Sequence, residues 1–137
     1  LLTTGALAVS VVAQNVETEV VTYSPATSAR VQDVYEMPAG ELVLDLSTVR
    51  DLDELDGRDI NVDVGAGRVE VIIPRDLSVS WSADVVGGRV EAFDTVAEGI
   101  DPGPSGNVHR GVDSPEIELD VSMVAGEIVI RESEALR

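Results

Sequence analysis

The chain has 137 residues, of which 26 are Asp or Glu and nine are Arg, with no Lys, so its formal net charge is −17. This length allows one domain with a modest hydrophobic core. This charge repels nucleic acid and anionic membrane surfaces, because phosphate binding needs a basic footprint, and we expect no nucleic-acid partner. The absence of Cys excludes disulfides and thiolate metal sites.

Residues 1–13, "LLTTGALAVSVVA", carry no charge and consist of apolar and small side chains. A transmembrane helix needs about 20 apolar residues, and a signal peptide needs a basic region before its apolar core. We therefore expect residues 1–13 to be the outer end of a transmembrane helix that starts upstream. An ordinary hydrophobic strand or helix is the alternative.

Residues 14–34 are polar and irregular, and Pro25 interrupts any regular element there. This composition predicts a connector, within which residues 20–23 have the pattern of a short edge strand.

A repeated pattern begins after the connector, and it occurs four times. The copies are "EMPAGELVL" (36–44), "DVGAGRVEV" (63–71), "DVVGGRVEA" (84–92) and "SMVAGEIVI" (122–130). Each copy contains a small residue followed by a glycine, and the four glycines are Gly40, Gly67, Gly88 and Gly126. A charged residue follows each glycine.

Apolar residues alternate on both sides of each glycine, as a half-buried strand requires. The inward positions that flank each glycine lie five residues apart, as Met37 and Leu42 do in the first copy. An odd step reverses the phase of the alternation, so both strands can face one core. Residues 35–132 are therefore predicted to form a β-repeat domain. Residues 133–137 are predicted to be a charged tail.

Two structures satisfy the five-residue step. One is a hairpin, and the other is a corner between two sheets. Ala-Gly fits a type II turn, which splays paired strands and therefore suits a corner. The predicted fold is all-β, a β-solenoid-like stack of short strands with small-Gly corners. The alternative is an antiparallel β-sandwich built from hairpins.

Residues 47–59 and 99–115 are predicted to be loops. Trp81 is predicted to be buried, because it lies in the inward phase of its strand.

Candidates for chemistry are few, and none of them meets the requirements of a known motif. His109, the single histidine, lies in the second loop without a nucleophile beside it. Asp63 and Asp84 occupy equivalent positions, and neighbouring copies would bring them together as an acid pair or a cation site. The acidic cluster of residues 51–59 lacks the spacing of a calcium-binding loop. We expect no catalytic residue, no cofactor and no metal site.

The charged residues after the glycines suggest a structural role. If the copies stack in chain order, Glu41 faces Arg68 and Arg89 faces Glu127. The last strand, near the C-terminus, would then form one end of the stack. Val129 there replaces a charge found in other copies, and Ile128, Val129 and Ile130 are accordingly our candidate interaction surface.

The chain resembles one known family through four segments: "VTYSPATSARV" (21–31), "AGELVLDLS" (39–47), "VDVGAGRVEVIIP" (62–74) and "LDVSMVAGEIVI" (119–130). It is similar to the C-terminal extracytoplasmic domain of actinobacterial membrane proteins with a phage-shock-protein-C domain. It is also similar to the C-terminal domain of cell-wall-antibiotic response proteins. The resemblance implies a right-handed β-solenoid-like fold, no catalysis, and a place in envelope-stress signalling.

The expected function is a non-enzymatic interaction or sensing domain on the extracytoplasmic side of a cell membrane. Its partners would be an envelope protein or a second copy, with the membrane contacted through the N-terminal segment. An adhesin-like or cation-binding structural surface domain is one alternative function, and a glycan-active enzyme is a further one.

Overall fold

The structure is a computed structural model that describes residues 20–101 and 103–133. It is all-β, as the sequence predicts. The predicted transmembrane segment, residues 1–13, lies outside the described residues. Among the described residues, no helix has the length and apolar character needed to cross a membrane.

Seven strands and three short 3-10 helices make up the fold. The strands are β1 (Val20–Tyr23), β2 (Val34–Asp45), β3 (Asp59–Ile73), β4 (Ser78–Ala92), β5 (Thr95–Ile100), β6 (Ser105–Val108) and β7 (Glu116–Glu132). The 3-10 helices are η1 (Ser28–Arg30), η2 (Leu46–Thr48) and η3 (Leu52–Leu55). The predicted loop at 47–59 therefore holds η3 and most of η2, and the predicted loop at 99–115 holds β6.

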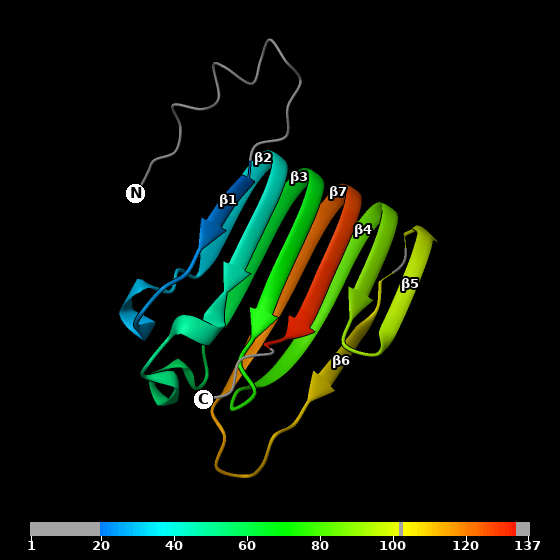
Figure 1. The fold of residues 1–137 in the computed structure, drawn as a ribbon. Helices are drawn as coiled ribbons and strands as arrows, with labels where there is room; N and C mark the ends of the chain where they lie inside the picture. Colours follow the sequence, from blue (N-terminus) through cyan, green and yellow to red (C-terminus); the bar gives the residue numbers. More distant parts are fainter. Residues whose placement is uncertain (1–19, 102, 134–137) are drawn as a thin grey trace.

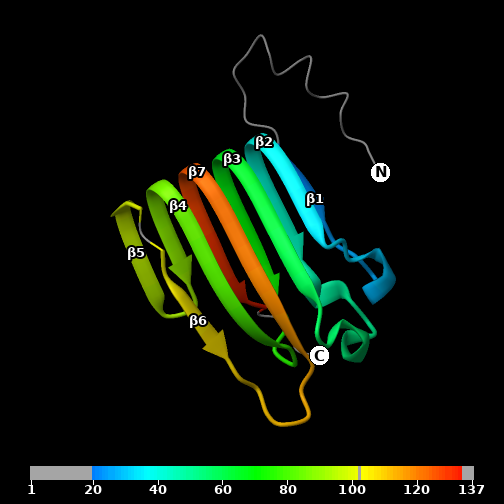
Figure 2. The same ribbon diagram turned by 180° about the vertical axis from the view of Figure 1, so that it is seen from behind.

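The strands form one sheet in the order β1-β2-β3-β7-β4-β5, with β6 also paired to β4 (Figures 1 and 2). Neighbours from β1 to β4 pair in parallel, whereas β5 and β6 pair with β4 in the antiparallel sense. The four copies of the repeat lie on β2, β3, β7 and β4. The expectation that the copies stack in chain order is therefore wrong, because the fourth copy inserts between the second and the third.

Each of the four long strands bends at its glycine, so that its two halves run in opposite directions (Figure 1). The four glycines have φ values of +123° (Gly40), +132° (Gly67), +153° (Gly88) and +137° (Gly126). Residues with a side chain rarely adopt this conformation. The glycines also pair in register across neighbouring strands, Gly40 with Gly67, Gly67 with Gly126, and Gly126 with Gly88. The bends therefore form one continuous row, which we call the corner.

The core lies between the two halves of the long strands and is filled by the inward positions of the alternating pattern. Val64 and Val69, which flank the bend of β3, are both fully buried, and Val85 and Val90 of β4 are nearly so. The five-residue step therefore keeps both halves facing the same core. Trp81 is also buried, with 5 % of its surface exposed.

The predicted boundary at residue 35 needs correction, because the described part of the connector belongs to the folded domain. β1 pairs with Glu41–Leu44 of β2, and Val31 is buried in the core. The ring of Tyr23 packs edge-on against Tyr35 at 4.7 Å between centroids. At the other end of the domain, the backbone N–H of Ser133 donates to Ile73 at 2.8 Å, so the predicted tail begins with an ordered residue.

Candidate interaction surfaces

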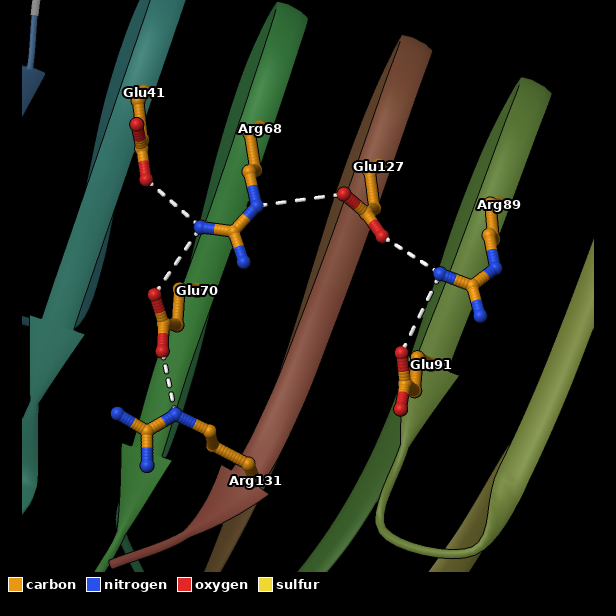
Figure 3. Close-up of polar contacts among 7 residues, drawn as sticks. All are labelled: Glu41, Arg68, Glu70, Arg89, Glu91, Glu127 and Arg131. Atoms are coloured by element: carbon orange, nitrogen blue, oxygen red, sulfur yellow. Dashed lines mark hydrogen bonds and ion pairs between the residues drawn. The ribbon is translucent and has the colours of Figure 1, made fainter.

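A ladder of alternating charges crosses the outer face of the halves that follow the corner (Figure 3). The guanidinium of Arg68 on β3 contacts Glu41 on β2 at 2.8 Å and Glu127 on β7 at 3.4 Å. On the other side of β7, Arg89 of β4 contacts Glu127 at 2.9 Å. Both predicted pairs are present. The order of the strands joins them into one row in which no two neighbours have the same sign.

Glu70 forms a second level of this network, one step further from the corner. It accepts hydrogen bonds from Arg131 at 2.5 Å and from Arg68 at 3.1 Å. The bond from Arg131, followed by that from Arg68, lowers the pKa of Glu70 below its usual value, against the opposing effect of partial burial. Each glutamate of this network on the long strands contacts an arginine, and three arginines serve the four glutamates Glu41, Glu70, Glu91 and Glu127, so a small excess of negative charge remains.

The outer face of the halves that precede the corner is different, because its charged side chains are acidic. Glu36, Asp63 and Asp84 lie in one row across the sheet, with Ser122 between the two aspartates. In a second row, Asp59 lies beside Glu118, and its charge raises the pKa of Glu118. No outward position in these four half-strands carries Arg, so this face is uncompensated.

The structure does not assemble a catalytic pair or a metal site from the predicted candidates. Asp63 and Asp84 are not on neighbouring strands, because β7 runs between them, so the expectation that they lie side by side is wrong. Asp51 of the acidic loop accepts two hydrogen bonds of 2.7 Å from Ser28, from the backbone N–H and from the hydroxyl. His109 is exposed. Within residues 20–101 and 103–133, no three metal-ligating side chains are arranged to hold an ion.

The interaction surface predicted at the C-terminal strand is also wrong. Ile128 and Ile130 are fully buried in the core, and Val129 is only 9 % exposed. Ile128 and Ile130 are buried because they occupy inward positions of the alternating pattern. Val129 points outward, and it is covered because β7 lies in the middle of the sheet between β3 and β4. Val129 lies on the outer face between Glu70 and Glu91, as a central apolar residue flanked by two charged neighbours.

The two ends of the sheet are covered to different extents. At one end, β5 pairs with Gly87–Ala92 of β4 and β6 pairs with Val79–Ser82, so both halves of β4 have a neighbour. At the other end, β1 pairs only with the half of β2 that follows the corner. Among the described residues, no strand pairs with the outer edge of Val34–Ala39. We call this segment the open edge.

The direction of the backbone groups at the open edge follows from a single hydrogen bond. The N–H of Asn61 in β3 donates to the carbonyl of Asp33 at 2.8 Å, so Asp33 points its backbone toward β3. Successive residues of a strand point their backbone groups to opposite sides. Val34 and Glu36 therefore direct their N–H and C=O groups away from β3, and the side chain of Val34 is 48 % exposed. Free backbone groups beside an exposed apolar residue are the features of an edge that accepts another strand.

Sequence reasoning placed the open end at the wrong strand, although the sequence contains a signal for the correct order. Stacking in chain order would put Arg68 next to Arg89, which is a like-charge contact. In the order β2-β3-β7-β4, the residues that follow the corner glycines are Glu, Arg, Glu and Arg, so opposite charges are neighbours throughout. Opposite charges on directly paired residues are favourable in a sheet, and like charges are not.

Comparison with known proteins shows a similarity in fold. No family model matches the chain, and no curated protein matches it. Among solved structures, the fold is similar to that of a putative cell adhesion protein from Clostridium sporogenes, with a TM-score of 0.51 and 20 % sequence identity. The similarity covers 73 % of this chain and 53 % of that protein, so the chain spans about half of that protein's length. At this identity, the similarity concerns the fold.

Proposed function

We propose that this domain is a non-enzymatic interaction module on the extracytoplasmic side of a cell membrane, which binds a protein partner by strand addition at the open edge of β2. The observation that carries the proposal is the unequal covering of the two ends of the sheet. The outward N–H and C=O groups of Val34 and Glu36 supply the affinity of such a contact. The exposed side chain of Val34 contributes to its specificity.

From the resemblance to the phage-shock-protein-C group, we infer that this module acts in an envelope-stress response. That assignment is part of the proposal, together with the attachment to the membrane through residues 1–13. Deletion of the domain from its membrane protein is expected to abolish induction of envelope-stress genes by a cell-wall antibiotic. Normal induction without the domain would contradict the assignment.

Val34→Pro tests the open edge, because proline removes a backbone N–H that points away from β3 and leaves the pairing with β3 in place. Val34→Ala is the matched control, since it shortens the same side chain and keeps the N–H. We expect Val34→Pro to lose at least tenfold in the amount of partner that copurifies from membranes, with an unchanged melting temperature, whereas Val34→Ala retains most of it. Equal copurification by both variants would refute strand addition at this edge.

A second candidate function is that of an adhesin-like surface domain. The observation in its favour is the similarity in fold to the putative cell adhesion protein. This function predicts that cells displaying the domain bind to a surface or to other cells, independently of antibiotic stress. Measured adhesion with and without the domain separates the two candidates.

A further inference from the structure

The corner carries a row of exposed apolar residues that neither charged face includes. The two residues before each of Gly40, Gly67, Gly126 and Gly88 are all Pro, Ala, Gly or Val. Val124 on β7 and Val86 on β4 are 59 % and 60 % exposed. Ile100 of β5 pairs with Gly87 beside them and is 90 % exposed. We call these residues the apolar ridge.

The ridge is a boundary between two charged regions, and its own residues are not ionisable. One carboxylate residue lies beside it, because the backbone N–H of Asp101 donates to the carbonyl of Val86 at 2.8 Å. On one side lies the ladder, whose first row has two glutamates and two arginines. On the other side lies the acidic row of Glu36, Asp63 and Asp84. In a chain with a net charge of −17, an uncharged strip across five strands is a distinct surface. Exposed contiguous apolar residues of this kind mark contact sites.

The opposite end of the strands has the reverse character. The segments there include η3 and the turns before β3 and β7 (Figure 1). They carry the loop carboxylates Asp51, Asp53, Glu54, Asp56 and Asp113, and Glu116 begins β7 beside them. Because anionic lipid headgroups repel negative charge, this end is disfavoured next to a membrane and the ridge is favoured.

The position at which the chain enters the fold identifies what covers the ridge. Val20 pairs with Glu41, the residue directly after Gly40, so β1 begins at the corner end of the sheet. Only residues 14–19 separate Val20 from the apolar segment 1–13. Six residues span at most about 20 Å when fully extended. An apolar segment embedded in a bilayer therefore keeps the β1 end of the corner within about 20 Å of the bilayer surface.

We propose that the apolar ridge rests against the lipid bilayer, with Val86, Val124 and Ile100 at the headgroup boundary and the acidic loops directed away. This inference depends on the membrane attachment proposed above. It fixes the orientation of the domain, because the long strands then run away from the membrane. Both charged faces and the open edge of β2 are perpendicular to the membrane plane in this orientation. A partner would reach the open edge from the side, within the plane of the membrane.

The experiment uses the absence of cysteine in the chain, which makes a single introduced cysteine a unique labelling site. Val124→Cys places a polarity-sensitive fluorophore on the ridge. Val112→Cys is the matched control, because Val112 is an exposed valine, 93 % accessible, in the loop between β6 and β7 at the opposite end. The whole membrane protein, with the upstream part of the transmembrane helix and any upstream cysteine replaced by serine, is reconstituted into phosphatidylcholine vesicles, and its incorporation is verified by flotation.

We expect the label at Val124→Cys to shift its emission to shorter wavelength on vesicles and to lose severalfold in quenching by aqueous iodide. The label at Val112→Cys is expected to keep the emission and the quenching that it has without vesicles. Flotation with an unshielded label at Val124→Cys, or with equal shielding at both sites, would overturn the orientation alone. Failure to float would refute the membrane attachment itself, and the orientation with it.

Discussion

Gly67 of β3 lies so close to Gly40 of β2 that a Cβ atom on Gly67 would overlap the carbonyl oxygen of Gly40. The same contact recurs between Gly126 and Gly67, and between Gly88 and Gly126. The corner therefore excludes side chains for two reasons: the positive φ values and the contact between backbones. The parallel, in-register stack of the four copies depends on this row.

Substitution at the corner tests this contact, and β4 supplies a control at the adjacent residue. We expect Gly88→Ala to destabilise the fold by at least about 3 kcal/mol, because it adds a backbone clash to the strain of a positive φ. Gly87→Ala places its Cβ in open space at an ordinary φ. It is expected to change the free energy of unfolding by less than about 1 kcal/mol. Similar values for the two variants, measured by denaturant unfolding, would show that the corner is not tightly packed.

The alternation and the corner could be predicted from local sequence patterns, whereas the order of the copies could not be predicted from apolar spacing. The spacing of Val64 and Val69 is enough to predict that both side chains face one core, because the direction of a side chain depends only on its position along its own strand. The insertion of β7 between β3 and β4 depends on a long-range return of the chain after β5 and β6. Apolar spacing is the same for either order, and only the signs of Glu41, Arg68, Glu127 and Arg89 distinguish them. The error about Val129 followed from that missed order, whereas Ile128 and Ile130 occupy inward positions that are buried in either order.

The burial of Trp81 yields a second expectation. Its ring lies 6.5 Å from that of Phe93, and Gly106 of β6 lies directly beside it. Trp81→Ala is expected to cost about 3–5 kcal/mol, as large-to-small changes of a buried aromatic residue do. The intrinsic fluorescence of the folded protein should peak at short wavelength and resist iodide. An emission maximum like that of free tryptophan in water would contradict this packing.

Glu70 predicts a pH dependence of stability with a definite sign. Its pKa is lowered in the folded protein by the hydrogen bonds from Arg131 and Arg68, so its contribution is present above the unfolded value of 4.5. That contribution is lost as the pH falls through the lower folded pKa. Glu70→Gln should therefore destabilise by about 1–2 kcal/mol at pH 7. The difference from wild type should vanish in strong acid, and a difference independent of pH would exclude the ionic origin.

Glu118 predicts the opposite sign. The charge of Asp59 raises the pKa of Glu118 in the folded protein, so folding favours the protonated form and stability rises as the pH falls through that pKa. Glu118→Gln is expected to melt at a higher temperature than wild type at pH 7. The advantage should shrink as the pH approaches the pKa of Glu118. A variant less stable than wild type at pH 7 would show that this carboxylate has a favourable partner.

The most direct test of binding at the open edge is a photo-crosslinking amino acid placed at Val34 in the membrane protein within intact cells. The same substitution at Val112 gives the background of an exposed site remote from the edge. We predict that Val34 crosslinks to one defined envelope protein or to a second copy of the chain, at an extended segment identified by peptide mapping. Crosslinks to a partner that form at Val112, and not at Val34, would contradict the account.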